Sequence, residues 1–207
     1  MIKTKSLNEY IHEILLKGYR YELTSEDLKK VNRIVLTEKD NDDNVIEYDF
    51  DDLRQLTELE SITLYKIIIT DDLIRNLNKL PKLKTLTCNG CAFQAKETLK
   101  TSLEMLIITD SFVSNLLNFN DITNLEKIEF VNVGVLDLEQ LRKFEEIKKI
   151  YIRNSKVLNF KTINEFKMLE YLNLDGSKID DDSFMDELKS KVEIEMQEYY
   201  HLSGNLK

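Results

Sequence analysis

The sequence predicts an α/β solenoid, in which short parallel strands stack on a concave face and short α- or 3₁₀-helical segments cover the convex face. Two periodic patterns predict this fold class. A six-residue phrase with apolar residues at its first, fourth and sixth positions begins at residues 59, 83, 103, 125, 147 and 169. Between these phrases, apolar residues recur at steps of three or four, which is typical of helical turns.

The six-residue phrase has the alternation of a strand with one buried face. Its complete copies begin at Leu59, Leu83, Leu103, Leu125, Ile147 and Leu169. A weaker copy begins at Val31, and Ile194 and Met196 repeat the pattern 22 residues after Leu172 and Leu174. Alternate side chains of a strand point to opposite faces, so one strand cannot bury its apolar side alone. Stacked copies can, and we expect about eight strands.

The segments between the strands predict short helices on the opposite side of the stack. Three series of apolar residues have helical spacing: Leu138, Leu141, Phe144 and Ile147; Leu73, Leu77, Leu80 and Leu83; and Ile179, Phe184 and Leu188. We interpret the acidic run at residues 180–182 as the solvated start of the third helix, where negative charge favours the helix dipole.

These repeats resemble those of leucine-rich-repeat proteins of the 22-residue class, and are similar to the internalin-like repeats of bacteria and to the repeats of a eukaryotic phosphatase regulator. The resemblance covers roughly residues 28–197. The family usually places Asn three residues after the last strand leucine. Here that position holds Ile67, Cys91, Ser111, Val133, Ser155 and Ser177. In the family, the amide of this Asn bonds to the backbone of adjacent turns. Serine and cysteine can supply part of that hydrogen bonding, but Ile67 and Val133 cannot, so we expect irregular turns at these two positions.

Both ends of a solenoid need covers, because a terminal repeat would otherwise expose its core. We expect a single domain with a helical cap at residues 1–30, a repeat array at 31–197 and a tail at 198–207. In the cap, Ser6 is the expected N-cap, Gly18 the expected stop, and a second helical piece begins near Thr24 or Ser25. The first helix presents its apolar face to the stack; the alternative is an amphipathic membrane helix. At the other end, Tyr199, Tyr200 and Leu202 are candidates for a lid.

Composition limits the classes of partner and compartment. The chain has 207 residues, of which 42% are hydrophobic and 32% charged, and its formal net charge is -9. Excess carboxylate repels nucleic-acid backbones and anionic membranes, so we expect neither as a partner. Two cysteines without a wider disulfide framework, and interrupted apolar stretches near the start, favour a cytoplasmic protein. The resemblance to internalin-like repeats implies that the protein is bacterial-like. Charged residues on the last strand favour a monomer.

Two motifs could carry chemistry, and both have a structural alternative. Cys88 and Cys91 have the C-x-x-C spacing of redox sites, but the repeat register makes both inward packing residues. Asp40, Asp42 and Asn44 have the opening spacing of a calcium loop, yet Val45 stands where glycine is required. We therefore interpret residues 40–52 as an acidic insertion in the first repeat. The sequence predicts no catalytic residue, no metal site and no cofactor.

The residues between the buried positions of the strands form columns on the concave face. Along these columns, the early repeats carry Thr, Ser and Asn, whereas the middle repeats carry apolar, aromatic and cationic side chains. The candidate partner-binding patch consists of Met105, Ile107, Lys127, Glu129, Tyr151, Arg153 and Tyr171. Tyr and Arg are common energetic anchors of protein interfaces, and the local positive charge favours an acidic segment of a partner.

The sequence therefore predicts a non-catalytic protein-interaction module that uses its concave face. Resemblance to the family permits a narrower role, an inhibitor or immunity-type protein that blocks an enzyme. A metal- or thiol-dependent enzyme and a purely structural spacer are the remaining alternatives. The first would show bound metal or reactive thiols, and the second would lose no partner when the patch is mutated.

Overall fold

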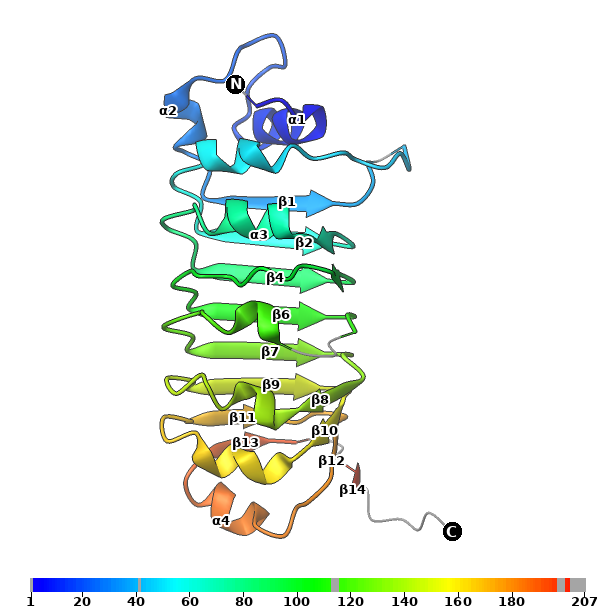
Figure 1. Ribbon diagram of the computed structural model, residues 1–207, viewed down its shortest axis with the longest axis vertical. Helices are drawn as coiled ribbons and strands as arrows, with labels where there is room; N and C mark the ends of the chain where they lie inside the picture. Colours follow the sequence, from blue (N-terminus) through cyan, green and yellow to red (C-terminus); the bar gives the residue numbers. More distant parts are fainter. Residues whose placement is uncertain (1, 41, 113–115, 197–199, 202–207) are drawn as a thin grey trace.

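The computed structural model describes residues 2–40, 42–112, 116–196 and 200–201. Within these residues, eight parallel strands form one sheet along the full length of the stack (Figure 1). In spatial order they are β1 (Arg33–Thr37), β2 (Ser61–Tyr65), β4 (Thr85–Asn89), β6 (Met105–Thr109), β7 (Lys127–Val131), β9 (Lys149–Arg153), β11 (Tyr171–Asn173) and β13 (Glu193–Glu195). The predicted solenoid and its parallel sheet are confirmed.

The strand register follows the repeat phrase residue by residue. Ile128 pairs with Ile150, which in turn pairs with Leu172, and all three side chains are fully buried. The residues between them, such as Glu129 and Tyr151, pair with one another on the outer face. Because every strand repeats this alternation, the leucines and isoleucines of successive repeats form one continuous core from the cap to the last repeat.

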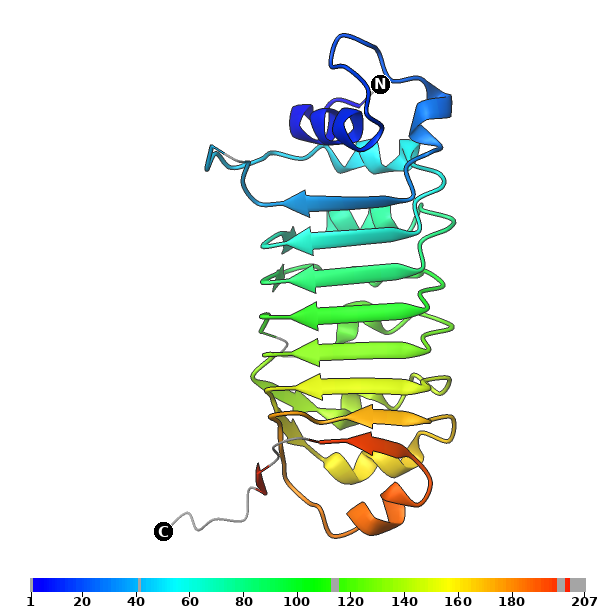
Figure 2. The same ribbon diagram turned by 180° about the vertical axis from the view of Figure 1, so that it is seen from behind.

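Helical segments cover the face of the stack opposite the main sheet (Figure 2). Those of the repeats are the 3₁₀ helices η1 (Phe50–Gln55), η2 (Leu117–Phe119), η3 (Leu138–Leu141) and η4 (Phe160–Glu165), with the α-helices α3 (Asp71–Leu77) and α4 (Met185–Lys189). The series beginning at Leu73 and Leu138 start in helices, as predicted, but Leu80, Leu83, Phe144 and Ile147 lie beyond the ends of α3 and η3. The third series is also only partly helical, because Ile179 belongs to a strand and the helix begins at Met185.

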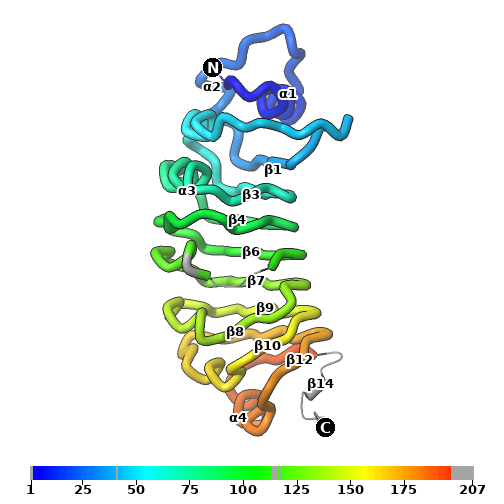
Figure 3. The backbone as a smooth tube through the Cα atoms, turned by 45° about the vertical axis from the view of Figure 1, so that its right-hand side comes forward, coloured from blue at the N-terminus to red at the C-terminus, as the bar shows by residue number. Residues whose placement is uncertain are grey.

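Short strands flank the main sheet along the edge where its strands end (Figure 3). β3 (Ile68–Ile69) pairs with β5 (Ala92–Phe93), and β8 (Val135–Asp137), β10 (Lys156–Leu158), β12 (Lys178–Ile179) and β14 (Tyr200–His201) form a second small sheet. All of these pairings are parallel. After β2, β4, β7, β9 and β11 the chain therefore turns sharply and adds a short strand.

The turns after β2, β4, β6, β7, β9 and β11 each contain a residue with left-handed backbone. These residues are Lys66, Gly90, Asp110, Asn132, Asn154 and Gly176, and their φ angles lie between 49° and 66°. The turn before Ile67 thus follows the common pattern, and the irregularity expected there is wrong. At Val133 the expectation is confirmed, because Gly134 adds a second left-handed residue with φ 75°. As a result, Val135 pairs with Lys156, which is shifted by one residue from the register of the main strands β7 and β9.

A ladder of serine hydroxyl groups links the turns where the family usually has asparagine. The hydroxyl of Ser177 accepts a hydrogen bond from the Ser155 amide at 3.2 Å and donates one to the Ile152 carbonyl at 2.8 Å. Ser155 accepts from the Val133 amide at 3.2 Å, and Ser111 accepts from the Cys91 amide at 3.0 Å. Buried amides are thereby satisfied by the next repeat, which holds adjacent turns together.

The N-terminal cap consists of α1 (Lys5–Ile14) and α2 (Ser25–Leu28). The expected start at Ser6 and stop at Gly18 are wrong: Thr4 is the N-cap, and Leu16, with a φ of 54°, turns the chain after the helix. A buried carboxylate explains the earlier start, because Asp52 accepts hydrogen bonds from the amides of residues 3 and 4. Leu7 and Ile11 face the core as predicted, and the second helix begins after Thr24 with a capping box.

The C-terminal repeat differs from expectation in its acidic run. The carboxylate of Asp180 accepts hydrogen bonds from the amides of Asn159 and Phe160 at 2.7 and 3.0 Å. It therefore caps η4 of the preceding repeat instead of starting α4, which begins at Met185. The predicted lid residues Tyr199 and Leu202, and most of the tail at 198–207, lie outside the described residues.

Candidate functional site

All seven residues predicted for partner binding lie on the outer face of the main sheet. Met105 and Ile107 come from β6, Lys127 and Glu129 from β7, Tyr151 and Arg153 from β9, and Tyr171 from β11. Each side chain is half-buried by its neighbours. Four adjacent strands thus bring residues that span 66 positions of the sequence into one surface, which we call the sheet patch.

The aromatic side chains of the sheet patch form a connected row. The ring centroids of Tyr151 and Tyr171 are 5.0 Å apart with an interplanar angle of 38°. The ammonium group of Lys127 lies 4.4 Å from the Tyr151 centroid, which is a cation–π contact. The Tyr171 hydroxyl donates to Glu195, and this hydrogen bond raises the pKa of Tyr171. The two rings are consequently held by neighbours on both sides.

Glu129 neutralises two of the cations at the centre of the sheet patch. Its carboxylate lies 3.5 Å from the ammonium group of Lys127 and forms an ion pair with Arg153. The Glu129 side chain is only 14% exposed, so this pairing is screened less by solvent than an exposed surface pair. The local positive charge inferred from the sequence is therefore smaller at this point than the number of cations indicates.

Lys149 is the cation that Glu129 does not reach. It is the register partner of Lys127 on one side and of Tyr171 on the other, and its side chain is exposed. Among the described residues, no ion pair or hydrogen bond of its ammonium group is found. A shallow hollow of about 240 Å³ opens here, and its lining consists of Thr85, Glu104, Met105, Glu126, Lys127, Lys148 and Lys149.

Within the part of the chain that the structure describes, two buried polar atoms in or beside the sheet patch have no hydrogen-bond partner. They are Nε of Arg153 and the hydroxyl oxygen of Thr109, which lie on the same column of the sheet across β7. A buried donor without an acceptor is costly. In the last repeats, by contrast, the buried polar side chain of the central column is hydrogen-bonded: the side-chain amide of Asn173 donates to Asp175 and Glu195.

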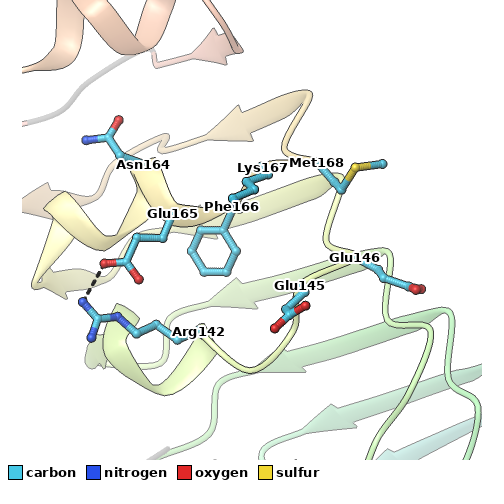
Figure 4. A pocket seen from close by; sticks show the side chains of 8 residues that line it. All are labelled: Arg142, Glu145, Glu146, Asn164, Glu165, Phe166, Lys167 and Met168. Atoms are coloured by element: carbon cyan, nitrogen blue, oxygen red, sulfur yellow. Dashed lines mark hydrogen bonds and ion pairs between the residues drawn. The ribbon is translucent and has the colours of Figure 1, made fainter.

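A larger hollow, which the sequence did not indicate, lies on the helical side of the stack (Figure 4). It measures about 650 Å³ and lies between the loops that follow η3 and η4. In Figure 4 the Phe166 ring stands between Glu145 and the ion pair of Arg142 with Glu165, whose charged atoms are 2.7 Å apart. Repeat periodicity predicts buried positions but not the path of these loops, so no sequence signal could have found this hollow.

The candidate chemical motifs have structural roles. Cys88 and Cys91 are buried, and the Cys91 thiol donates to the Leu64 carbonyl at 3.3 Å, as the repeat register predicts. The hydrogen bond with Cys91 and burial raise the pKa of the Cys88 thiol. The Asp40 carboxylate accepts hydrogen bonds from the amides of Asp42 and Asn44, which closes a tight turn. In the described part of the chain, no cluster of three His, Cys, Asp or Glu side chains is placed to hold a metal ion.

The stacked parallel strands, the left-handed turns and the hydroxyl ladder define the class of protein: the chain has the leucine-rich-repeat fold. Among solved structures, internalin C2 of Listeria monocytogenes is similar over 95% of this chain and 94% of that chain, with 18% identity and a TM-score of 0.57. An internalin F from the same organism aligns over 97% and 77%, with 16% identity and a TM-score of 0.40. These likenesses concern the fold alone.

A complex of TLR13 with single-stranded RNA also aligns, over 86% of this chain and 34% of that chain, with 15% identity and a TM-score of 0.47. No family model matches the sequence, and no curated protein matches it. No helix in the described residues is long and apolar enough to cross a membrane.

Proposed function

We propose that this protein is a non-catalytic interaction module that binds a protein partner through the sheet patch. The observation that carries the proposal is the position of Lys149. It stands beside Lys127 on the neighbouring strand, and the only carboxylate of the sheet patch, Glu129, is already engaged by Lys127 and Arg153. Like charges on adjacent strands are destabilising. A carboxylate supplied by a partner would remove that repulsion.

The partner surface that fits the sheet patch combines an acidic group with an apolar one. The lining of the hollow beside Lys149 includes Met105 and the cations Lys127 and Lys148. It also includes Glu104 and Glu126, whose carboxylates are already paired with Lys84 and Lys148. Next to it, the paired rings of Tyr151 and Tyr171 offer a large contact area that is already ordered. Burying such aromatic side chains is a frequent source of binding energy in protein interfaces.

A protein suits this surface better than a nucleic acid. Glu129 lies at the centre of the sheet patch, and Glu193 and Glu195 occupy the last strand of the same face. A regularly charged phosphate backbone would meet these carboxylates, whereas a protein can place a single acidic side chain at Lys149. The net charge of -9 adds to this discrimination.

We also propose that the protein acts as a monomer in a reducing, cytoplasmic environment. The two buried cysteines are free thiols, which supports such a compartment. Glu193 and Glu195 on the terminal strand disfavour pairing with a second chain. An inhibitor or immunity-type role would use the same sheet patch, and the partner's identity would distinguish it from a general interaction module.

The proposal is tested by affinity capture from the cells that make the protein. Wild-type protein is compared with the variants Tyr151→Ala/Arg153→Ala and Lys149→Glu. We expect both variants to lose the same protein that the wild type captures. Lys161→Glu is the matched control, because Lys161 is exposed on the helical side and its reversal changes the net charge equally.

The outcome is read by quantitative mass spectrometry, with circular dichroism to confirm that each variant is folded. Retention of the wild-type partner by both sheet variants would refute the sheet patch. Loss of the partner on Lys161→Glu alone would place binding on the helical side. If the captured protein is an enzyme whose activity falls when it is bound, the inhibitor role is supported.

A further inference from the structure

A second exposed row of side chains runs along the edge where the main strands end. The short flanking strands there have a common pattern, because the first residue of β3, β8, β10 and β12 is exposed and the second is buried. The exposed residues, with Ala92 and Phe112 from the intervening repeats, form what we call the rim stripe. Its members are Ile68, Ala92, Phe112, Val135, Lys156 and Lys178.

Strand pairing aligns these residues parallel to the stack axis. Ile68 pairs with Ala92, and Val135 pairs with Lys156, which pairs with Lys178. Phe112 follows Ser111 in the turn just as Ala92 follows Cys91, so it occupies the equivalent place in its repeat. Six repeats spaced by about 4.8 Å give a row about 24 Å long. In Figure 1 the flanking strands that carry it lie toward the right-hand side of the stack, where the arrows of the main strands end.

The rim stripe changes character along its length. Its first four members are apolar, and Ile68, Phe112 and Val135 are 47%, 79% and 45% exposed. Single exposed apolar residues are common on protein surfaces, but one at the same place in each of four consecutive repeats makes a contiguous patch. The last two members are Lys156 and Lys178, for which the described residues provide no ion pair.

We infer that the rim stripe is a second docking surface, for an extended protein segment that is apolar at one end and acidic at the other. The length of the row corresponds to about seven residues of extended chain. The acidic end would pair with Lys156 and Lys178, whose charge is not neutralised within the chain. The apolar end would cover Ile68, Phe112 and Val135 and remove them from water.

Two copies of this chain do not complement each other through their rim stripes. In an antiparallel arrangement, Lys156 and Lys178 of one copy would lie against Ile68 and Ala92 of the other, without a charge partner. A parallel arrangement would place the lysines of both copies together, which is repulsive. The rim stripe also differs in residues and in orientation from the sheet patch, so it does not depend on the function proposed for that patch.

A random library of displayed twelve-residue peptides tests the inference directly. Peptides are selected on the full-length protein and counter-selected on the variant Phe112→Ser/Lys156→Glu/Lys178→Glu. We expect enriched peptides to carry apolar residues toward one end and Asp or Glu toward the other. An enriched peptide, labelled with a fluorophore, should bind at least tenfold more weakly to Phe112→Ser and to Lys156→Glu/Lys178→Glu.

Charge exchange provides the sharpest arm of this experiment. A peptide whose acidic residues are replaced with Lys should bind Lys156→Glu/Lys178→Glu better than it binds the wild type. The control Lys161→Glu/Lys167→Glu reverses two exposed lysines on the helical side and should leave the affinity unchanged. Tyr151→Ala/Arg153→Ala should also leave it unchanged, which separates this surface from the sheet patch.

Three results would overturn the inference: no enrichment after counter-selection, equal affinity of the rim variants and the wild type, or enriched peptides without acidic residues. Binding of phosphatidylserine vesicles that is lost in the rim variants, without peptide binding, would instead assign the stripe to a lipid surface. The substituted side chains are exposed, so unchanged thermal unfolding is expected and shows that each variant is folded.

Discussion

The hydroxyl ladder gives a quantitative prediction for Ser177→Ala. The Ser177 side chain is fully buried and serves two backbone groups of the preceding repeat, the amide of Ser155 and the carbonyl of Ile152. Alanine removes both hydrogen bonds but leaves both groups buried. Because each unsatisfied buried group costs about 1–3 kcal/mol, and the amide bond is long at 3.2 Å, we expect a loss of about 2–4 kcal/mol.

Equilibrium urea unfolding, followed by far-ultraviolet circular dichroism, measures this loss. The midpoint should fall while the slope with urea concentration stays the same, since the variant buries nearly the same surface. Ser190→Ala is the matched control, because the Ser190 hydroxyl is exposed and bonds only within its own turn. That control should change the free energy of unfolding by less than about 0.5 kcal/mol.

A loss below about 0.5 kcal/mol for Ser177→Ala, with an unchanged slope, would refute the ladder. It would mean that water or a shifted backbone satisfies the amide of Ser155 as well as the hydroxyl does. A changed slope would indicate that the terminal repeat unfolds separately from the rest of the stack.

Three further predictions concern the cap, the helical side and a turn. Both ring nitrogens of His12 face carbonyl oxygens, of Tyr21 at 2.7 Å and Asn8 at 2.9 Å, and these bonds raise the pKa of His12. The stabilisation that His12 contributes is therefore full below pH about 6.5 and is lost as the pH rises through its folded-state pKa. Nuclear magnetic resonance titration measures that pKa. Unfolding of His12→Gln should lack this pH dependence. Burial lowers the pKa of Lys143 to about 8. Cyanate should therefore modify Lys143 faster than Lys161 at pH 8, as measured by peptide mapping. Equal rates at the two lysines would contradict this. Gly176→Ala should lower stability by about 1–2 kcal/mol in urea unfolding, because φ is 66° and the added Cβ would collide with the Asn154 side chain; an unchanged midpoint would count against that strain.

The sequence predicted the register of the main strands because two periods reinforce one another. Alternation within each strand and recurrence about every 22 residues both place Ile150 and Leu172 in the core, so the register leaves little freedom. The outer columns follow from the same register, which is why all seven residues of the sheet patch lie together. The burial of Cys88 and Cys91 follows from it as well.

The errors arose where a side chain serves a different repeat. Asp180 resembled a helix start by its position in the sequence, yet it caps a helix 20 residues earlier in the chain. The sharing of Glu129 between Lys127 and Arg153 likewise depends on rotamers that periodicity does not specify. The cap helix began early because Asp52, far along the chain, binds the amides of Lys3 and Thr4, which directly precede the helix.

Site-specific photocrosslinking tests the central proposal most directly. Tyr151 and, in a separate variant, Lys161 are replaced with p-benzoylphenylalanine, and each protein is irradiated in the cells that make it. Residue 151 lies within the sheet patch and residue 161 on the helical side of the stack. We predict a covalent adduct with one protein from position 151 and none with that protein from position 161. An adduct with that partner from position 161 alone would contradict binding through the sheet patch.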